Sequence, residues 1–303
     1  MATVSLANHG SELHVFRGHQ KSPTDFIMGH EFTGEVVEMG ENVKRFQKGD
    51  KIVSPFTISC GECFYCQKGF SSRCEKSQLY GSAVLDGGQA EYARIPLADS
   101  TVVKAPEEID EKKLVLMADI FPTGYFAAYN AFKGQEHAEI WDQTVVLIGC
   151  GPVAMCALVN ALEYNPKHLL AVDSIPERLD QAKKLGAEPW NFKDNKEGLV
   201  KRVKELTNGR GADAIIECVG HSDALGLGFE LLRPWGRISS IGVHNGEIPW
   251  SGNQAYGKNL SIQMGRCPVR SIFDKALKQL AKNQDKLRYI NTQALKLGED
   301  FLC

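Results

Sequence analysis

The stretch "TVVLIGCGPVAMCALVNALEYNPKHLLAVDS", residues 144–174, constrains the fold more than any other part of the chain. An apolar run of strand length precedes the pattern G-x-G-x-x-A at Gly149, Gly151 and Ala154. A helical pattern follows, and a second apolar run ends in Asp173. A strand, a glycine turn, a helix and a second strand that ends in an acid are typical of a dinucleotide-binding βαβ unit.

Each position of this turn has a physical role in binding a dinucleotide. Gly149 permits the tight turn, Gly151 lets the backbone approach a pyrophosphate, and Ala154 is small enough for close packing of helix against strand. The helix start at Gly151, Pro152 and Val153 is expected to face the phosphates, where helix N-termini bind anions. The alternative is a glycine turn in an α/β domain that binds no nucleotide.

Asp173 favours NAD over NADP. A carboxylate accepts hydrogen bonds from the ribose hydroxyls and repels a 2′-phosphate, and the next residue, Ser174, is not basic. Arg178 leaves the choice between NAD and NADP open, because its guanidinium could either approach a phosphate or pair with an acid.

The rest of the chain shows two kinds of sequence pattern. Residues 30–106 contain short β segments separated by glycine turns, namely 34–40, 50–55, 90–96 and 101–106. After residue 143, apolar strand-sized runs alternate with helical patterns, which predicts an α/β fold with a doubly wound parallel sheet. The expected strands are 144–149, 168–173, 212–220, 237–243 and 259–264. The expected helices are 152–164, 176–185, 197–207 and 221–233, with a last one at 271–284.

Four cysteines lie close together in "CGECFYCQKGFSSRC": Cys60, Cys63, Cys66 and Cys74. Thiolates three residues apart converge on one ion, and a fourth after a short loop closes a tetrahedron, which favours structural zinc. An iron–sulfur centre, a redox dithiol and disulfides are the alternatives. The total of nine cysteines is odd and no export signal is visible, which favours a reducing cytoplasm and disfavours disulfides.

Composition excludes several function classes. The formal net charge is -2, so no basic field steers the chain to nucleic acid or to an anionic membrane. The apolar runs are too short to span a bilayer. A hydrophobic content of 43% is sufficient for a core.

Five segments occur in an order that resembles one family: "GHEFTGEVVEMGENVKRFQKGDKIV", the four-cysteine loop, "DIFPTGY", "VLIGCGPVA" and "GRCPVRS". The chain resembles the zinc-containing alcohol dehydrogenases of the medium-chain dehydrogenase/reductase superfamily, and within them the formaldehyde-dehydrogenase-like branch. The resemblance implies a GroES-like β-rich catalytic domain at 1–122, a Rossmann domain at 123–268, and a C-terminal helix with a partial return to the catalytic domain at 269–303. It also implies one structural and one catalytic zinc ion.

The resemblance places the catalytic zinc on His30, Glu31 and Asp119, with Glu31 also in a catalytic role. The family usually opens this site with a cysteine in C-G-S-D/E-L-H, where this chain has His9 in "HGSELH". Imidazole in place of thiolate adds one unit of positive charge to the metal centre. Ser11 and His14 match the proton-relay positions. Further cofactor contacts are expected at four residues outside the glycine turn, namely Thr123, Val219, Gly242 and Arg266.

These observations predict a cytoplasmic oxidoreductase that transfers a hydride between an alcohol or aldehyde and NAD, and that forms a homodimer or homotetramer. The family's flanking strands are not recognisable in "MATVSLAN" or after residue 288, so the β-rich domain is expected to be incomplete at its ends. One alternative is therefore a catalytically weak or inactive relative that binds NAD and structural zinc only. A zinc-ribbon binding module fused to an unrelated α/β domain is the other.

Overall fold

The structure is a computed structural model, and it describes residues 1–7, 12, 15–18, 21–288 and 290. The chain divides into two units, one formed by residues 1–122 and 268–303 and the other by residues 123–267. No helix in these described ranges combines the length and the apolar character that crossing a bilayer requires.

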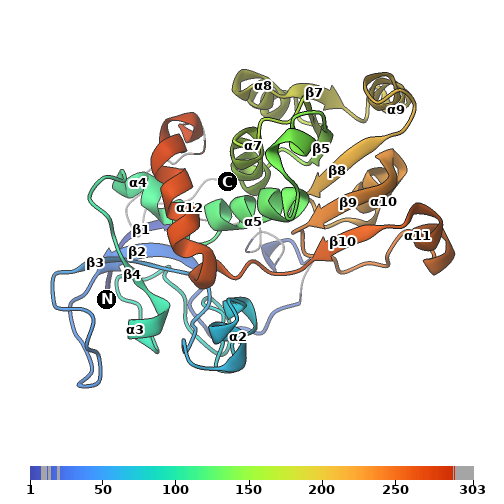
Figure 1. The fold of residues 1–303 in the computed structure, drawn as a ribbon. Coiled ribbons are helices and arrows are strands. Elements are labelled where there is room, and N and C mark those ends of the chain that lie inside the picture. The colour runs from blue at the N-terminus through green and yellow to red at the C-terminus, as the bar shows by residue number, and fades with distance from the viewer. Residues whose placement is uncertain (8–11, 13–14, 19–20, 289, 291–303) are drawn as a thin grey trace. The chain divides into compact units, whose positions relative to one another are not determined.

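The first unit contains a four-stranded sheet whose neighbouring strands all run antiparallel (Figure 1). Its strands, in sheet order, are β1 (Ala2–Ala7), β2 (Glu31–Glu35), β3 (Lys51–Ser54) and β4 (Val103–Lys104). Phe32 of β2 is fully buried and packs edge-to-face on Tyr80, with ring centroids 5.0 Å apart. This contact forms the centre of a small apolar core beneath the sheet.

Short helices connect and cover these strands. They are α2 (Phe64–Gln67), η1 (Ser71–Arg73), α3 (Ala98–Thr101), α4 (Glu111–Leu114), η2 (Val115–Ala118), α12 (Val269–Asn283) and η3 (Gln284–Leu287). Ser71 and Ser271 join η1 to the start of α12: each backbone N–H donates to the other residue's hydroxyl at 3.2 Å. The two chain segments of this discontinuous unit therefore meet beside the cysteine loop.

The second unit is a six-stranded, entirely parallel sheet in the order β10-β9-β8-β5-β6-β7 (Figure 1). Its strands are β5 (Thr144–Ile148), β6 (His168–Asp173), β7 (Glu188–Asn191), β8 (Ala212–Glu217), β9 (Leu232–Ser240) and β10 (Ser261–Met264). All five residues of β5 are buried, as expected for a central strand covered on both faces. The chain places β6 and β7 on one side of β5 and returns to place β8 on the other.

The helices of this unit alternate with its strands. They are α6 (His137–Ile140), α7 (Pro152–Leu162), α8 (Pro176–Leu185), α9 (Lys196–Leu206), α10 (Ser222–Leu231) and α11 (Gly252–Lys258), and α5 (Ile120–Phe132) leads into the unit from the first one. The α/β fold with a β-rich domain and a doubly wound parallel sheet is confirmed.

Several expected elements differ from the structure. Residues 2–7 form β1, although "MATVSLAN" was not expected to resemble a strand of the family, because β2 offers them an antiparallel partner. The expected strand at 34–40 overlaps β2 only at Gly34 and Glu35, because the strand begins and ends earlier. The expected strand at 90–96 is wrong: the segment forms an isolated bridge at Tyr92, where Ala93 exchanges backbone hydrogen bonds with Met1. The expected strand at 101–106 is reduced to Val103–Lys104.

Three elements of the second unit were missed, and one of them is the short helix α6 (His137–Ile140). Glu188–Asn191 forms the edge strand β7, and Gly252–Lys258 forms α11, whose capping box joins Ser251 to Gln254. The remaining strands and helices of this unit fall within the expected ranges or begin up to five residues earlier, as β9 does.

Candidate functional site

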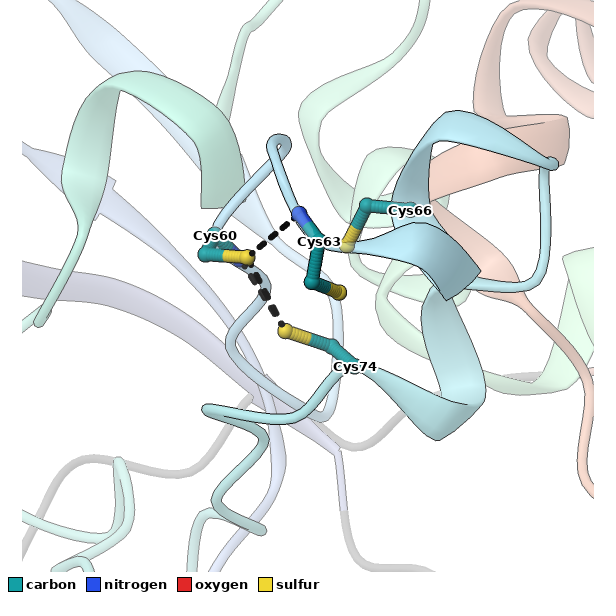
Figure 2. Close-up of side chains that lie close together, drawn as sticks. All are labelled: Cys60, Cys63, Cys66 and Cys74. Carbon is teal, nitrogen blue, oxygen red and sulfur yellow. Dashed lines mark hydrogen bonds between the residues drawn. The ribbon is translucent and has the colours of Figure 1, made fainter.

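The four cysteines of the first unit converge as their spacing predicts (Figure 2). Their four sulfur atoms all lie within 4.8 Å of one another, and all four thiols are free. A zinc ion 2.3 Å from each of four sulfurs in a tetrahedron sets the sulfurs about 3.8 Å apart, so the site has the size of a zinc tetrathiolate. The Sγ atoms of Cys60 and Cys74 are 3.5 Å apart.

Backbone N–H groups orient these sulfurs. Cys60 N–H donates to Sγ of Cys74 at 3.2 Å, Cys63 N–H to Sγ of Cys60 at 3.4 Å, and Lys76 N–H to Sγ of Cys74 at 3.4 Å. Backbone hydrogen bonds from Cys66 and Glu75 lower the pKa of Cys63 to about 6, whereas burial raises the pKa of Cys74 and raises that of Cys66 to about 12. Such donors stabilise thiolates, the form that binds zinc, so the loop is folded as a metal site.

A second cluster forms around His30 in the same unit. His30 precedes β2, Glu31 begins it, and Asp119 lies between η2 and α5. His30 Nε2 is 3.4 Å from Oδ2 of Asp119. Two ligand atoms 2.1 Å from a tetrahedral zinc ion lie about 3.4 Å apart, so this nitrogen and this oxygen have the separation of two zinc ligands.

Glycines set the position of His30. The preceding residue, Gly29, has φ +94°, a value that side chains other than hydrogen disfavour. A Cβ on Gly87 would lie 2.0 Å from the carbonyl oxygen of Gly29, and a Cβ on Gly88 would lie 2.4 Å from the ring of Phe32. The "LDGGQ" loop therefore packs its bare backbone against the entry to β2, which fixes where the imidazole lies.

Glu12 is a functional residue that the sequence analysis missed. Its Oε1 lies 2.9 Å from Nδ1 of His30, on the side of the ring opposite Asp119. A carboxylate on the second nitrogen of a ligating histidine fixes the tautomer and raises the basicity of the ligand. The signal was present, because Glu12 occupies the D/E position of C-G-S-D/E-L-H.

Glu31 is bound to the start of α5 through one carboxylate oxygen. It is 1% exposed, and its Oε1 accepts the N–H of Ile120 at 3.1 Å. Among the residues that the structure describes, only the four cysteines bring three or more ligand atoms within 4.8 Å of one another. The structure therefore pairs His30 with Asp119 and places Glu31 beside the helix α5, so its role as a ligand stays a prediction.

The electrostatics of this cluster favour a cation. Burial and the charge of Asp119 raise the pKa of Glu31 well above its usual range. Burial acts to lower the pKa of His30, but hydrogen bonds to Asp119 and Glu12 outweigh it and raise the pKa to about 10. Three carboxyl groups, from Glu12, Glu31 and Asp119, lie around one imidazole, and a divalent ion there would relieve the repulsion among them. His9, Ser11 and His14 lie outside the described residues.

The dinucleotide turn lies in the second unit. Gly149 follows β5 with φ +90°, and a Cβ there would lie 2.8 Å from Cγ2 of Val219. Gly151 is the N-cap of α7, Pro152 is its first residue, and no atom lies within 4 Å of a Cβ built on Gly151. Open space in front of a bare helix N-terminus is what an approaching pyrophosphate needs.

Asp173 ties β6 to this turn. Its Oδ2 accepts the N–H of Cys150 at 2.7 Å, and its Oδ1 accepts those of Ser174 at 2.7 Å and Ile175 at 3.0 Å. Three donors leave about one of the four lone-pair sites of the carboxylate for a ribose hydroxyl. Arg178 lies beside it, with NH1 3.8 Å from Oδ2 of Asp173.

The remaining predicted cofactor residues have different positions. Val219 follows β8 and is 49% exposed at the carboxyl end of the sheet. Gly242 follows β9, but a Cβ there would lie 2.2 Å from the backbone nitrogen of Gly220, which indicates a packing role. Thr123 lies on α5, and Arg266 is exposed two residues after β10.

Known proteins share this architecture. Residues 2–107 match the family described as "Alcohol dehydrogenase GroES-like domain", and residues 152–282 match "Zinc-binding dehydrogenase". The solved structure "Alcohol dehydrogenase TADH from Thermus sp. ATN1" is similar in fold, with a TM-score of 0.81 and 33% identity. That similarity covers 93% of this chain and 80% of the other.

Curated relatives are similar along most of the chain. The "Zinc-type alcohol dehydrogenase B" of Aspergillus flavus is 69% identical over 96% of this chain and 68% of its own length. The "Formaldehyde dismutase" of Pseudomonas putida is 31% identical over 90% of this chain and 74% of its own length. These similarities support a zinc-dependent alcohol oxidoreductase and give no support to the inactive alternative. The chain belongs to the zinc-containing alcohol dehydrogenases of the medium-chain dehydrogenase/reductase superfamily.

Proposed function

We propose that this zinc-dependent oxidoreductase oxidises a small alcohol, or reduces the matching aldehyde, with NAD as the hydride carrier. The observation that carries the proposal is the pair formed by His30 Nε2 and Asp119 Oδ2, 3.4 Å apart in a buried, carboxylate-rich site. A zinc ion held there would supply Lewis-acid polarisation of the substrate oxygen. His9 and Glu31 are the further proposed ligands.

The chain's own groups would prepare this reaction. Glu12 lies against Nδ1 of His30, so the ring would keep its hydrogen on Nδ1 and offer Nε2 to a metal ion that displaces the second proton. Ser11 and His14, the proposed relay, would carry the proton of the alcohol to solvent.

NAD is the proposed carrier because Asp173 bears a negative charge where NADP has its 2′-phosphate. The carboxylate is held by three backbone N–H groups, so it cannot swing aside to admit a second anion. Arg178 is 45% exposed at the side chain, and its distance of 3.8 Å from Asp173 makes it a pairing partner for that carboxylate.

We also propose a homodimer or homotetramer in the cytoplasm. Strand β10 is the edge of the parallel sheet, and Ile262 on it is 37% exposed. An open edge with an exposed apolar side chain is a surface on which a second copy can add its own strand. A reducing compartment would keep the four thiols of the cysteine loop available for zinc.

An assay of the purified protein tests the activity. We expect formation of NADH, followed at its absorbance band, from at least one member of a panel of primary and secondary alcohols, and little formation of NADPH. Metal analysis should give two zinc ions per chain. Chelator treatment should abolish turnover and added zinc should restore it. One zinc ion per chain with no NADH from any alcohol would establish the inactive alternative instead.

The effect of His9 is tested by its own variant. Because imidazole leaves one more positive charge on the metal than thiolate does, the pH–rate profile of the unchanged protein should lie at lower pH than that of His9→Cys. Coincident profiles would show that residue 9 does not bind the ion.

A further inference from the structure

His244 lies in a buried polar cluster that the zinc chemistry does not use. Its side chain is 8% exposed, and its Nε2 lies 3.0 Å from Oε2 of Glu217 and 2.9 Å from Oγ of Ser240. The Ser240 hydroxyl donates to the same Oε2 at 2.7 Å. Because an ionised carboxylate only accepts hydrogen bonds, Nε2 of His244 carries the hydrogen and donates it.

Glu217 is the centre of this cluster and is fully buried. Its other oxygen, Oε1, accepts the N–H groups of Val219 and Gly220, both at 2.7 Å. One carboxylate therefore binds the loop after β8 with one oxygen and the turn after β9 with the other. The buried carboxylate has four hydrogen-bond donors, so removing one of them is expected to disturb the positions of both loops.

The cluster lies at the carboxyl ends of the central strands. Ile148 of β5, Glu217 of β8 and Ser240 of β9 are successive neighbours across the parallel sheet. The chain reverses its direction of strand addition between β5 and β8, and ligands of open α/β sheets bind outside the carboxyl ends at such a point. Gly149, the first residue of the dinucleotide turn, directly follows Ile148.

The two loops joined by Glu217 are packed backbone to backbone. A Cβ on Gly220 would lie 2.6 Å from the carbonyl oxygen of Val243, and a Cβ on Gly149 would contact Val219 at 2.8 Å. Val219 and Val243 nonetheless leave 49% and 75% of their surfaces exposed. The loops thus present two apolar side chains beside the phosphate-binding turn, a surface suited to a flat, weakly polar ring.

We infer that His244 is a positioning residue, which fixes the loops after β8 and β9 so that Val219 and Val243 form the wall that receives the nicotinamide half of the dinucleotide. This inference rests on the proposed function. The adenosine half is assigned to Asp173 on the other side of Gly149, after β6. Along the sheet edge β6-β5-β8-β9, the remaining half of an extended dinucleotide lies toward β8 and β9.

Two ligands separate this role from general stabilisation. NADH contains the nicotinamide half, and ADP-ribose lacks it but retains the adenosine and both phosphates. We expect His244→Ala to weaken NADH binding about tenfold, since a charge-assisted hydrogen bond is lost, and to change ADP-ribose binding less than about twofold. His244→Gln should recover most of the affinity, because its amide N–H₂ can take the place of Nε2–H.

His221→Asn is the matched control. His221 lies in the same β8–α10 connection, its side chain is 68% exposed, and its Nδ1 caps α10 by accepting the N–H of Asp223, which asparagine can also do. Both dissociation constants should stay unchanged in it. The affinities are measured by fluorescence titration with NADH and by calorimetry with ADP-ribose, so no turnover is needed.

Three outcomes would overturn the inference. Equal losses for both ligands in His244→Ala would show that the histidine only supports the fold, and unchanged NADH binding would show that it does not position the wall. If the unchanged protein binds neither ligand, the proposed dinucleotide site itself is wrong and the inference fails with it. If the unchanged protein binds both ligands but the His244 variants do not behave as expected, only the inference about His244 is wrong and the proposed function is unaffected.

Discussion

Oε1 of Glu12 lies 2.9 Å from Nδ1 of His30, and this contact leaves Nε2 of the same ring facing Asp119. Carboxylates beside both ring nitrogens orient the imidazole. The geometry needed to bind zinc is therefore built into the folded chain, and the first prediction tests it.

Glu12→Gln should weaken the more labile of the two zinc sites about 10- to 100-fold, because an amide holds the ring less firmly and donates less electron density through it. Competition with a chelator of known affinity measures this. Glu35→Gln, an exposed position on β2, is the control and should bind zinc as the unchanged protein does. Equal zinc affinity in both variants would mean that Glu12 has no influence on the metal.

Cys74→Ser should lose one zinc ion per chain, because a hydroxyl is a poor replacement for a thiolate in a tetrahedral sulfur site. We expect the unfolding free energy to fall by about 3 kcal/mol or more, or roughly 6–12 °C in the unfolding midpoint. Metal analysis and calorimetry provide the two measurements.

The control for this experiment is Cys156→Ala, which removes a fully buried thiol on α7 that lies outside the cysteine loop. It should keep both zinc ions even if its stability decreases. Retention of two zinc ions by Cys74→Ser would instead contradict the tetrathiolate site.

Asp173→Ser should shift cofactor preference toward NADPH by at least about tenfold, the size of one charge-assisted interaction. Without the carboxylate, the N–H groups of Cys150, Ser174 and Ile175 lose their acceptor, and Arg178 loses its anionic neighbour. These three N–H groups and the guanidinium of Arg178 would then be available to bind a 2′-phosphate. Dissociation constants for NADH and NADPH give the ratio.

The double variant Asp173→Ser with Arg178→Ala separates the two contributions. It should lose most of the gained affinity for NADPH. If the double and single variants bind NADPH equally well, the guanidinium plays no part.

Glu188 makes the edge strand β7 sensitive to acid. Hydrogen bonds from Arg202, at 2.8 and 3.0 Å, and from Trp190 lower the pKa of Glu188 below its usual value. A carboxylate with a lowered folded pKa contributes stability above its unfolded pKa of about 4.5 and loses it as the pH falls through the folded pKa. The difference between the unfolding free energies at pH 6 and pH 3 should therefore be smaller in Arg202→Met than in the unchanged protein.

The expected reduction is only about 0.5 kcal/mol, because both side chains are more than a third exposed and water screens the pair. Lys201→Met is the control, since Lys201 makes only an exposed contact with Glu205 at 3.9 Å. Lys201→Met is measured under the same acid conditions and would lose zinc in the same way. Its unfolding free energy should show the same pH dependence as that of the unchanged protein.

The sequence predicted most of the parallel sheet because its signals are local. Residues 144–173 combine a buried run, a glycine turn and a helix whose Pro152 is acceptable only at a first turn, so each element indicates the same fold. Strand β7, with the sequence EPWN, was not predicted, because a proline argues against a strand. The proline is tolerated here because β7 lies at the edge of the sheet.

The site was predictable where ligands come from one short segment and less so where they come from several. The cysteine spacing specified a metal loop by itself. Glu12, His30 and Asp119 are far apart in sequence, and tertiary packing brings their side chains together, so no local pattern indicates the cluster. The orientation of Glu31 toward Ile120 depends on where α5 begins, which no periodic pattern specifies.

The reciprocal hydrogen bonds between Ser71 and Ser271 have a consequence for the order in which the protein is made. The cysteine loop emerges from the ribosome long before its partner helix α12, with the whole of the parallel sheet in between. The β-rich unit therefore waits unfinished while its neighbour folds, and its nascent thiols stay accessible to cellular zinc, and to oxidants, throughout that interval.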